Sequence, residues 1–174
     1  MARKRAIGGA IALIALTVTV AAGAISASAA RSDSEHGSAS SLVGTWDVTV
    51  TIQNPPPGLV PVQRLLATFT RDGGTTESAA VPAALRGASH GAWYRTGRDL
   101  FSMTRVFFRF NPQTGAYLGT QKINATIRVA AGSETFKAVS LAELRDADGN
   151  LVLAGLRSTA VGTRMHVERI PDQP

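Results

Sequence analysis

Residue types that commonly carry out catalysis or bind metals are sparse in this chain, which has three histidines and no cysteine. The lack of cysteine excludes thiolate nucleophiles and zinc–thiolate sites. His90 stands just before a predicted strand, where it could act as a general base or simply hydrogen-bond the backbone. His166 alternates with Met165 and Val167 and is expected to face away from them. No spacing joins the histidines into a metal site, so we predict no metal, no cofactor and no identifiable catalytic residue.

One acidic segment, residues 146–150, resembles half of a calcium-binding loop. It reads Asp-Ala-Asp-Gly-Asn, and a complete loop needs further oxygen ligands and a bidentate glutamate downstream. Leu151, Val152 and Leu153 follow instead and supply no ligand. The segment therefore predicts a tight turn between two strands.

The most suggestive side chains are the aromatic and thioether groups gathered between residues 91 and 110. They could pack a solid core, or part of their surface could line a cavity for an apolar molecule. Small residues in later strands would leave room for such a ligand, and a few polar groups (Ser102, Thr104, Asn124 and Ser140) would orient it. The predicted ligand-binding residues are Trp93, Phe101, Met103, Phe108, Asn124, Ala125 and Ala138.

The elements that must position these side chains are strands. Trp46, Val48, Val50 and Ile52 alternate with polar residues, which predicts a strand with one buried face. Further strands are expected at 65–70, 75–81, 91–96, 100–110, 116–129, 135–144, 151–160 and 162–170. Because the turns between them are short, neighbouring strands should be antiparallel. We predict an all-β meander of eight to nine strands closed into a barrel, with a two-sheet β-sandwich as the alternative.

The two ends of this strand series carry a family resemblance. Gly44-Thr45-Trp46 opens the first strand and resembles the Gly-x-Trp signature of the lipocalins and the wider calycin group. In that group an arginine late in the last strand packs across the tryptophan and closes the barrel, and Arg164 is the matching residue here. The resemblance implies a calycin-like barrel with Gly44, Trp46 and Arg164 in structural roles. The chain departs from the group in lacking a Thr-Asp-Tyr segment, a disulfide and a predicted helix after the last strand.

The N-terminus has the pattern of an export signal. Arg3, Lys4 and Arg5 precede an uncharged apolar run at 6–25, and small residues at 26–30 favour cleavage after Ala29. The alternative is a retained membrane anchor, since the run is about long enough to span a bilayer. We predict a signal peptide at 1–29, a disordered tail at 30–41 and a barrel domain at 42–171. The mature protein would be secreted, extracellular or periplasmic, and free of the membrane.

Charge argues against a nucleic-acid partner. The chain has 18 basic and 12 acidic residues, and removal of three basic residues with the signal leaves 15 against 12, or +3. The remaining arginines are scattered and form no basic stripe. The partner expected instead is a small apolar molecule, and the oligomeric state stays open.

Three function classes follow from this pattern. The first is a secreted protein that holds an apolar ligand inside the barrel, and the second is a barrel cyclase or isomerase that shapes a small apolar substrate. The third is a secreted interaction module with a solid core. An inward titratable residue among Asp47, Glu77, Tyr94 and Glu143 would favour the enzyme, whereas a filled interior would favour the interaction module.

Overall fold

A computed structural model describes residues 41–82 and 84–169, while the predicted signal peptide and the predicted tail up to residue 40 lie outside these residues. Within the described residues the chain forms eight strands and no helix. The strands are β1 (Gly44–Ile52), β2 (Val62–Phe69), β3 (Gly74–Ala79), β4 (Ser89–Arg95), β5 (Leu100–Phe110), β6 (Tyr117–Val129), β7 (Thr135–Arg145) and β8 (Leu151–Arg164). Accordingly, no helix long and apolar enough to cross a membrane is found in this part of the chain.

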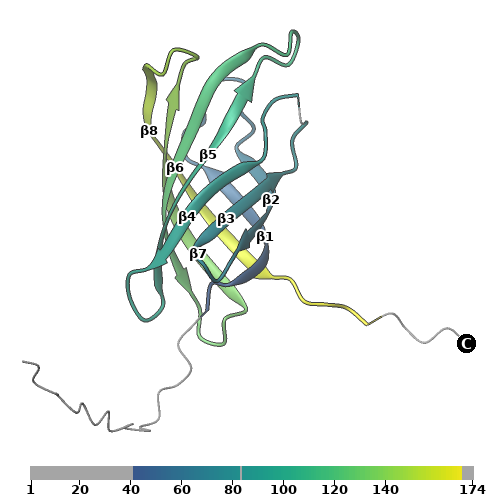
Figure 1. The fold of residues 1–174 in the computed structure, drawn as a ribbon, viewed down its shortest axis with the longest axis vertical. Helices are drawn as coiled ribbons and strands as arrows, with labels where there is room; N and C mark the ends of the chain where they lie inside the picture. Colours follow the sequence, from purple (N-terminus) through teal and green to yellow (C-terminus); the bar gives the residue numbers. More distant parts are fainter. Residues whose placement is uncertain (1–40, 83, 170–174) are drawn as a thin grey trace, which may run out of the picture. The chain divides into compact units, whose positions relative to one another are not determined.

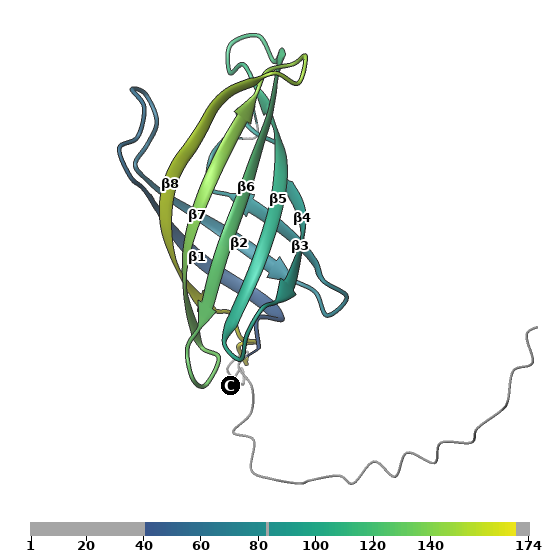
Figure 2. The same cartoon turned by 90° about the vertical axis from the view of Figure 1, so that its left-hand side faces the viewer.

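The strands form one antiparallel meander that closes on itself. Each strand pairs with its neighbours in sequence, and β1 also pairs with β8, so that Trp46 faces Ala67 on one side and Arg164 on the other. Figures 1 and 2 show the strands wrapping around a common axis, with β1 beside β8. The predicted all-β barrel of calycin-like architecture is thus confirmed, and the β-sandwich alternative is not.

The last two predicted strands, 151–160 and 162–170, are a single strand that ends at Arg164. Gly162 does not interrupt this strand, because it pairs with both Val48 and Phe136. A side chain at position 162 would collide with the Phe136 ring, so the glycine makes room for an aromatic core residue. Gly162 therefore serves core packing within one continuous strand.

Alternation along the strands sorts the residues into an inner and an outer face. On β1, Trp46 and Val48 are buried in the interior, whereas Thr49 and Thr51 are exposed. The described core consists mainly of large inward side chains of the strands, joined by Leu42 from the segment before β1. Its members are Leu42, Trp46, Val48, Leu65, Ala67, Phe69, Phe101, Met103, Ile127, Val129 and Phe136.

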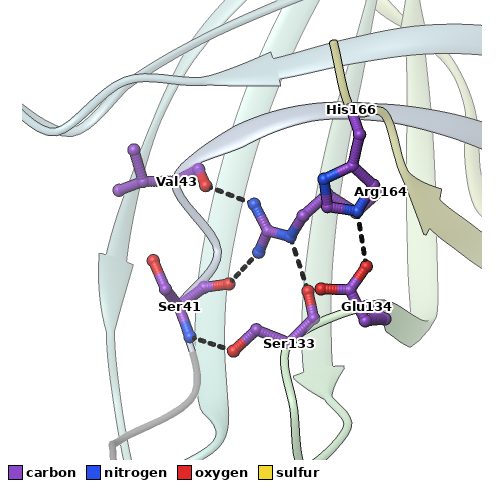
Figure 3. A network of polar contacts seen from close by, with 6 residues as sticks. All are labelled: Ser41, Val43, Ser133, Glu134, Arg164 and His166. Atoms are coloured by element: carbon purple, nitrogen blue, oxygen red, sulfur yellow. Dashed lines mark hydrogen bonds and ion pairs between the residues drawn. The ribbon is translucent and has the colours of Figure 1, made fainter. Parts of the chain in front are cut away.

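One end of the barrel is closed by the predicted pair of Trp46 and Arg164. The guanidinium carbon of Arg164 lies 4.2 Å from the centroid of the Trp46 ring. Arg164 also donates hydrogen bonds of 2.6, 2.7 and 2.6 Å to the carbonyl oxygens of Ser133, Val43 and Ser41 (Figure 3). The planar guanidinium therefore covers the indole and joins the chain before β1 to the β6–β7 turn.

The backbone at position 44, two residues before Trp46, requires a glycine. Its φ angle is 133°, in the region that glycine readily adopts, and a Cβ there would lie 2.5 Å from Nη1 of Arg164. The indole Nε1 of Trp46 donates a 2.9 Å hydrogen bond to the carbonyl of Leu42. Gly44, Trp46 and Arg164 therefore lie in direct contact at the closed end of the barrel.

Candidate functional site

The end of the barrel opposite Trp46 opens into a cavity of about 400 Å³. Its walls are inward side chains of strands on all sides of the barrel, among them Val50, Leu65 and Ile123. Its rim includes residues of the β1–β2, β3–β4 and β5–β6 connections, which lie at the upper end in Figure 1. Most of the lining is aliphatic or aromatic, and the small side chains of Ala125 and Ala160 leave the space unfilled.

Three of the predicted ligand-binding residues, Met103, Ala125 and Ala138, line this cavity. Trp93 and Phe101 lie elsewhere, in the aromatic packing toward the closed end. Their ring centroids are 5.7 Å apart, and the Phe69 ring packs edge-on against Trp93 at 6.2 Å. Trp93 and Phe101 therefore pack in the core, and neither side chain lines the cavity.

Phe108 and Asn124, expected on the cavity wall, lie on the outer face of the barrel. Phe108 is 56% exposed and packs against the Tyr117 ring at 5.9 Å. Asn124 accepts a 2.7 Å hydrogen bond from the Thr104 hydroxyl on the neighbouring strand. Residues 106–110 are apolar on both faces, so hydrophobicity alone did not define the phase of β5. Once Met103 faces inward, alternation places Phe108 outside.

Among the four polar groups expected to orient a ligand, Ser140 alone lines the cavity. Its hydroxyl shares a 2.6 Å hydrogen bond with that of Ser158 on β8, which also lines the wall. Thr104 is exposed on the outer face, and Ser102 alternates with the buried Phe101 and Met103. Further hydrogen-bonding groups on the wall are Gln63, Gln121 and four charged residues, Glu77, Arg86, Arg105 and Arg109.

A buried ion-pair cluster of Glu77, Arg86 and Arg105 forms one wall. Glu77 Oε1 lies 2.7 Å from Nη2 of Arg86, and Oε2 forms an ion pair with Nη1 of Arg105. The Glu77 side chain is fully buried, and the side chains of Arg86 and Arg105 are only 11% and 9% exposed. β3 supplies the glutamate, β5 supplies Arg105, and the connection before β4 supplies Arg86. The barrel thus encloses charge in a mostly apolar space, which requires close pairing.

The surroundings of Arg105 and Arg86 show how these charges are accommodated. Burial lowers the pKa of Arg105, and the neighbouring Glu77 carboxylate opposes this shift. The guanidinium carbon of Arg86 lies 3.6 Å from the centroid of the Phe107 ring, so its face stacks on an aromatic side chain. The carboxylate thus stabilises both arginines inside the barrel, and the ring stabilises Arg86.

His90, His166 and the acidic turn take no part in this site. His90 is exposed on β4, and His166 lies near Glu134 on the surface, with 2.6 Å between Nε2 and Oε2 (Figure 3). Asp146 accepts hydrogen bonds from the backbone amides of Asp148 and Asn150, as expected of a β-hairpin turn. Within the described residues, no three histidine, aspartate or glutamate side chains converge as a metal site would require.

The arginines of the cavity were missed as site residues, although β5 carries a signal for two of them. Arg105 and Arg109 share the parity of Phe101 and Met103, so a strict period of two places all four on one face. Counting apolar residues obscured this signal, because the opposite parity carries Val106, Phe108 and Phe110. Glu77 was one of four titratable candidates, and no local pattern distinguished it from the others.

Comparison of the chain with protein-family models, curated proteins and solved structures gave no match. The barrel itself has a calycin-like architecture. The features that bear on function are the cavity and its charged wall. Such a site can enclose an apolar molecule and can offer hydrogen bonds from arginine at one side.

Proposed function

We propose that this protein binds a small, largely apolar molecule inside its barrel. The observation that carries the proposal is the cavity of about 400 Å³, open at one end and lined mostly by apolar side chains. Ligand sites in proteins commonly occupy roughly 300–1,000 Å³ and combine an apolar lining with a few polar groups. The resemblance of Gly44, Trp46 and Arg164 to the lipocalin pattern favours the same function, because barrels of eight strands can hold one small ligand.

The hollow interior argues against the solid-core interaction module. Ala125, Ala138 and Ala142 face the space where larger side chains would fill a barrel of this size. An apolar cavity left empty costs stability, since its lining loses dispersion contacts. A ligand that occupies the cavity restores those contacts and supplies a favourable free energy of binding.

A barrel cyclase or isomerase is the second candidate, and the inward position of Glu77 favours it. Asp47, Tyr94 and Glu143 do not share this position: Tyr94 is 66% exposed, and the other two pair with basic residues toward solvent. Each oxygen of Glu77, however, is engaged by an arginine. A general base must reach the proton that it removes, so Glu77 could act only after Arg86 or Arg105 withdrew. This favours binding without chemistry.

Cavity-filling variants test the binding function. N-phenyl-1-naphthylamine, an uncharged apolar fluorophore, should bind the wild type, and Ala125→Phe or Ala138→Phe should abolish its binding while the fold survives. Thr126→Phe and Lys137→Phe are matched controls, because these neighbours are exposed on the outer face. Absence of probe binding to the wild type, or equal binding by all four variants, would contradict the proposal.

Native mass spectrometry distinguishes the two candidates. Protein purified from its own culture medium should carry a small molecule of defined mass if it is a carrier. That compound, released and incubated again with fresh protein, should then be recovered unchanged by chromatography. Conversion to an isomer, lost in Glu77→Gln, would instead establish the enzyme.

A further inference from the structure

The charged residues that line the cavity are not balanced. Among the described lining residues, Glu77 contributes one negative charge, whereas Arg86, Arg105 and Arg109 contribute three positive charges. Glu77 pairs with Arg86 and Arg105, but Arg109 has no ion pair within the described part of the chain. The cavity wall therefore carries an excess of two positive charges beside an apolar space, an arrangement that is costly without a counter-charge.

The placement of Arg109 adds to this imbalance. Arg86 and Arg109 face each other across an antiparallel bridge, held by a hydrogen bond from the amide of Gly87 to the carbonyl of Phe108. Like charges directly opposite one another on paired strands are destabilising. Because both side chains line the cavity, an anion bound there would offset the positive charge of both.

Arg109 also supplies hydrogen-bond donors that no carboxylate of the described structure engages. It lines the cavity and appears in none of the described ion pairs, whereas Arg86 and Arg105 both pair with Glu77. A guanidinium offers five N–H groups in a planar fork that suits carboxylate oxygens, so Arg109 matches an anionic head group.

We infer that the ligand is an amphipathic monocarboxylate whose head group binds to Arg109 and Arg86, an assignment that rests on the proposed binding function. Arg109 lies at the end of β5 near the open rim, where Phe110 and Pro112 also line the cavity. The carboxylate therefore lies toward the rim. The apolar chain extends toward Met103, Ile127 and Phe136, which line the cavity nearer its closed end.

Three ligands of equal chain length test the charge of the head group. Dodecanoate, dodecanol and dodecylamine are used to displace N-phenyl-1-naphthylamine from the wild type at neutral pH. Dodecanoate should bind at least about tenfold more tightly than dodecanol, as expected when a charged hydrogen bond is gained. Dodecylamine should bind most weakly. Equal affinities for the acid and the alcohol would overturn the inference and leave the binding function intact, whereas no binding of the fluorophore would overturn both.

Variants of Arg109 test its position, because they break no ion pair in the described structure. Arg109→Gln should weaken dodecanoate binding roughly tenfold and leave dodecanol binding unchanged, and Arg109→Lys should restore part of the loss. Arg157→Gln is the matched control, since Arg157 is exposed on the outer face of β8. An equal loss for both ligands in Arg109→Gln, or an equal effect of Arg157→Gln on dodecanoate, would overturn the assignment. Urea unfolding of each variant verifies that the fold is retained.

Discussion

At the residue scale, Arg164 combines two kinds of contact, hydrogen bonds to backbone carbonyls and stacking on an indole. Its three hydrogen bonds end on backbone carbonyls that precede β1 or lie in the β6–β7 turn, while its face covers Trp46. Lysine could offer a charge there, but not a planar surface with donors in a fork. The closed end therefore depends on the geometry of the guanidinium as much as on its charge.

We therefore expect Arg164→Lys to lower the free energy of unfolding measurably and Trp46→Ala to lower it by roughly 3–5 kcal/mol, as for other large-to-small core changes. Urea denaturation followed by circular dichroism measures both. Arg157→Lys, on the outer face of the same strand, is the control and should stay within about 0.5 kcal/mol of the wild type. An Arg164→Lys variant as stable as this control would show that the stacked pair contributes nothing.

Glu77 should be the acidic residue on which stability depends most. Its replacement by glutamine leaves Arg86 and Arg105 buried without a counter-charge, which should cost about 3–5 kcal/mol. Asp47→Asn is the matched control, because it breaks a pair whose Arg64 and Asp47 side chains are 68% and 40% exposed. Exposed pairs contribute about 0–1 kcal/mol. Similar unfolding free energies for the two variants would contradict the role of the buried cluster.

At the scale of the element, alternation predicted strands better than it predicted their faces. β1 was predicted in the correct phase, because Trp46, Val48 and Val50 alternate with threonine and aspartate. The phase of β5 was not predicted correctly, since apolar side chains occupy both even-numbered and odd-numbered positions after Thr104. The inner face of β5 carries Phe101, Met103 and Phe107 together with Arg105. Arg105 pairs with Glu77 on β3, a contact between distant elements that no local pattern contains.

The turn between β7 and β8 illustrates an element whose stability depends on pH. Hydrogen bonds from the Asn150 side chain first, and then from the Asn150 backbone, lower the pKa of Asp146 below its usual value of 3.8. A depressed carboxyl pKa in the folded state stabilises the protein above the unfolded pKa, and this contribution is lost as pH falls through the folded pKa. The stabilisation is therefore fully present at neutral pH, and it changes with pH in the acidic range alone.

Asp146→Ala should therefore be less stable than the wild type at neutral pH, and the difference should shrink as pH falls below 3.8 toward the folded pKa. Thermal unfolding between pH 7 and pH 2 measures the difference. Asp148→Ala, at the exposed tip of the same turn, is the control. A difference that stays constant across this pH range would mean that the Asp146 carboxylate does not stabilise the turn through its charge.

At the scale of the whole molecule, closure takes the place of covalent crosslinks. The chain has no cysteine, and the β1–β8 ladder from Trp46 opposite Arg164 to Ile52 opposite Ser158 leaves the described sheet without an open edge. Stability then depends on burial in a core that is concentrated toward the closed end. Such a domain is independent of the redox state of its surroundings, so its stability does not test the export expected from its N-terminus.

That expectation concerns residues outside the described structure and is tested on the full chain. If residues 1–29 form a cleaved signal, N-terminal sequencing of the exported protein should begin at Ala30. Signal peptidase requires small residues at the first and third positions before the cut, here Ala29 and Ala27. Ala29→Arg should therefore retain the precursor in the membrane fraction, whereas Ser28→Arg, at the unrestricted position between them, should be cleaved normally. Wild-type protein recovered from membranes with Met1 intact would establish a permanent anchor, and the ligand would then be bound at the membrane surface.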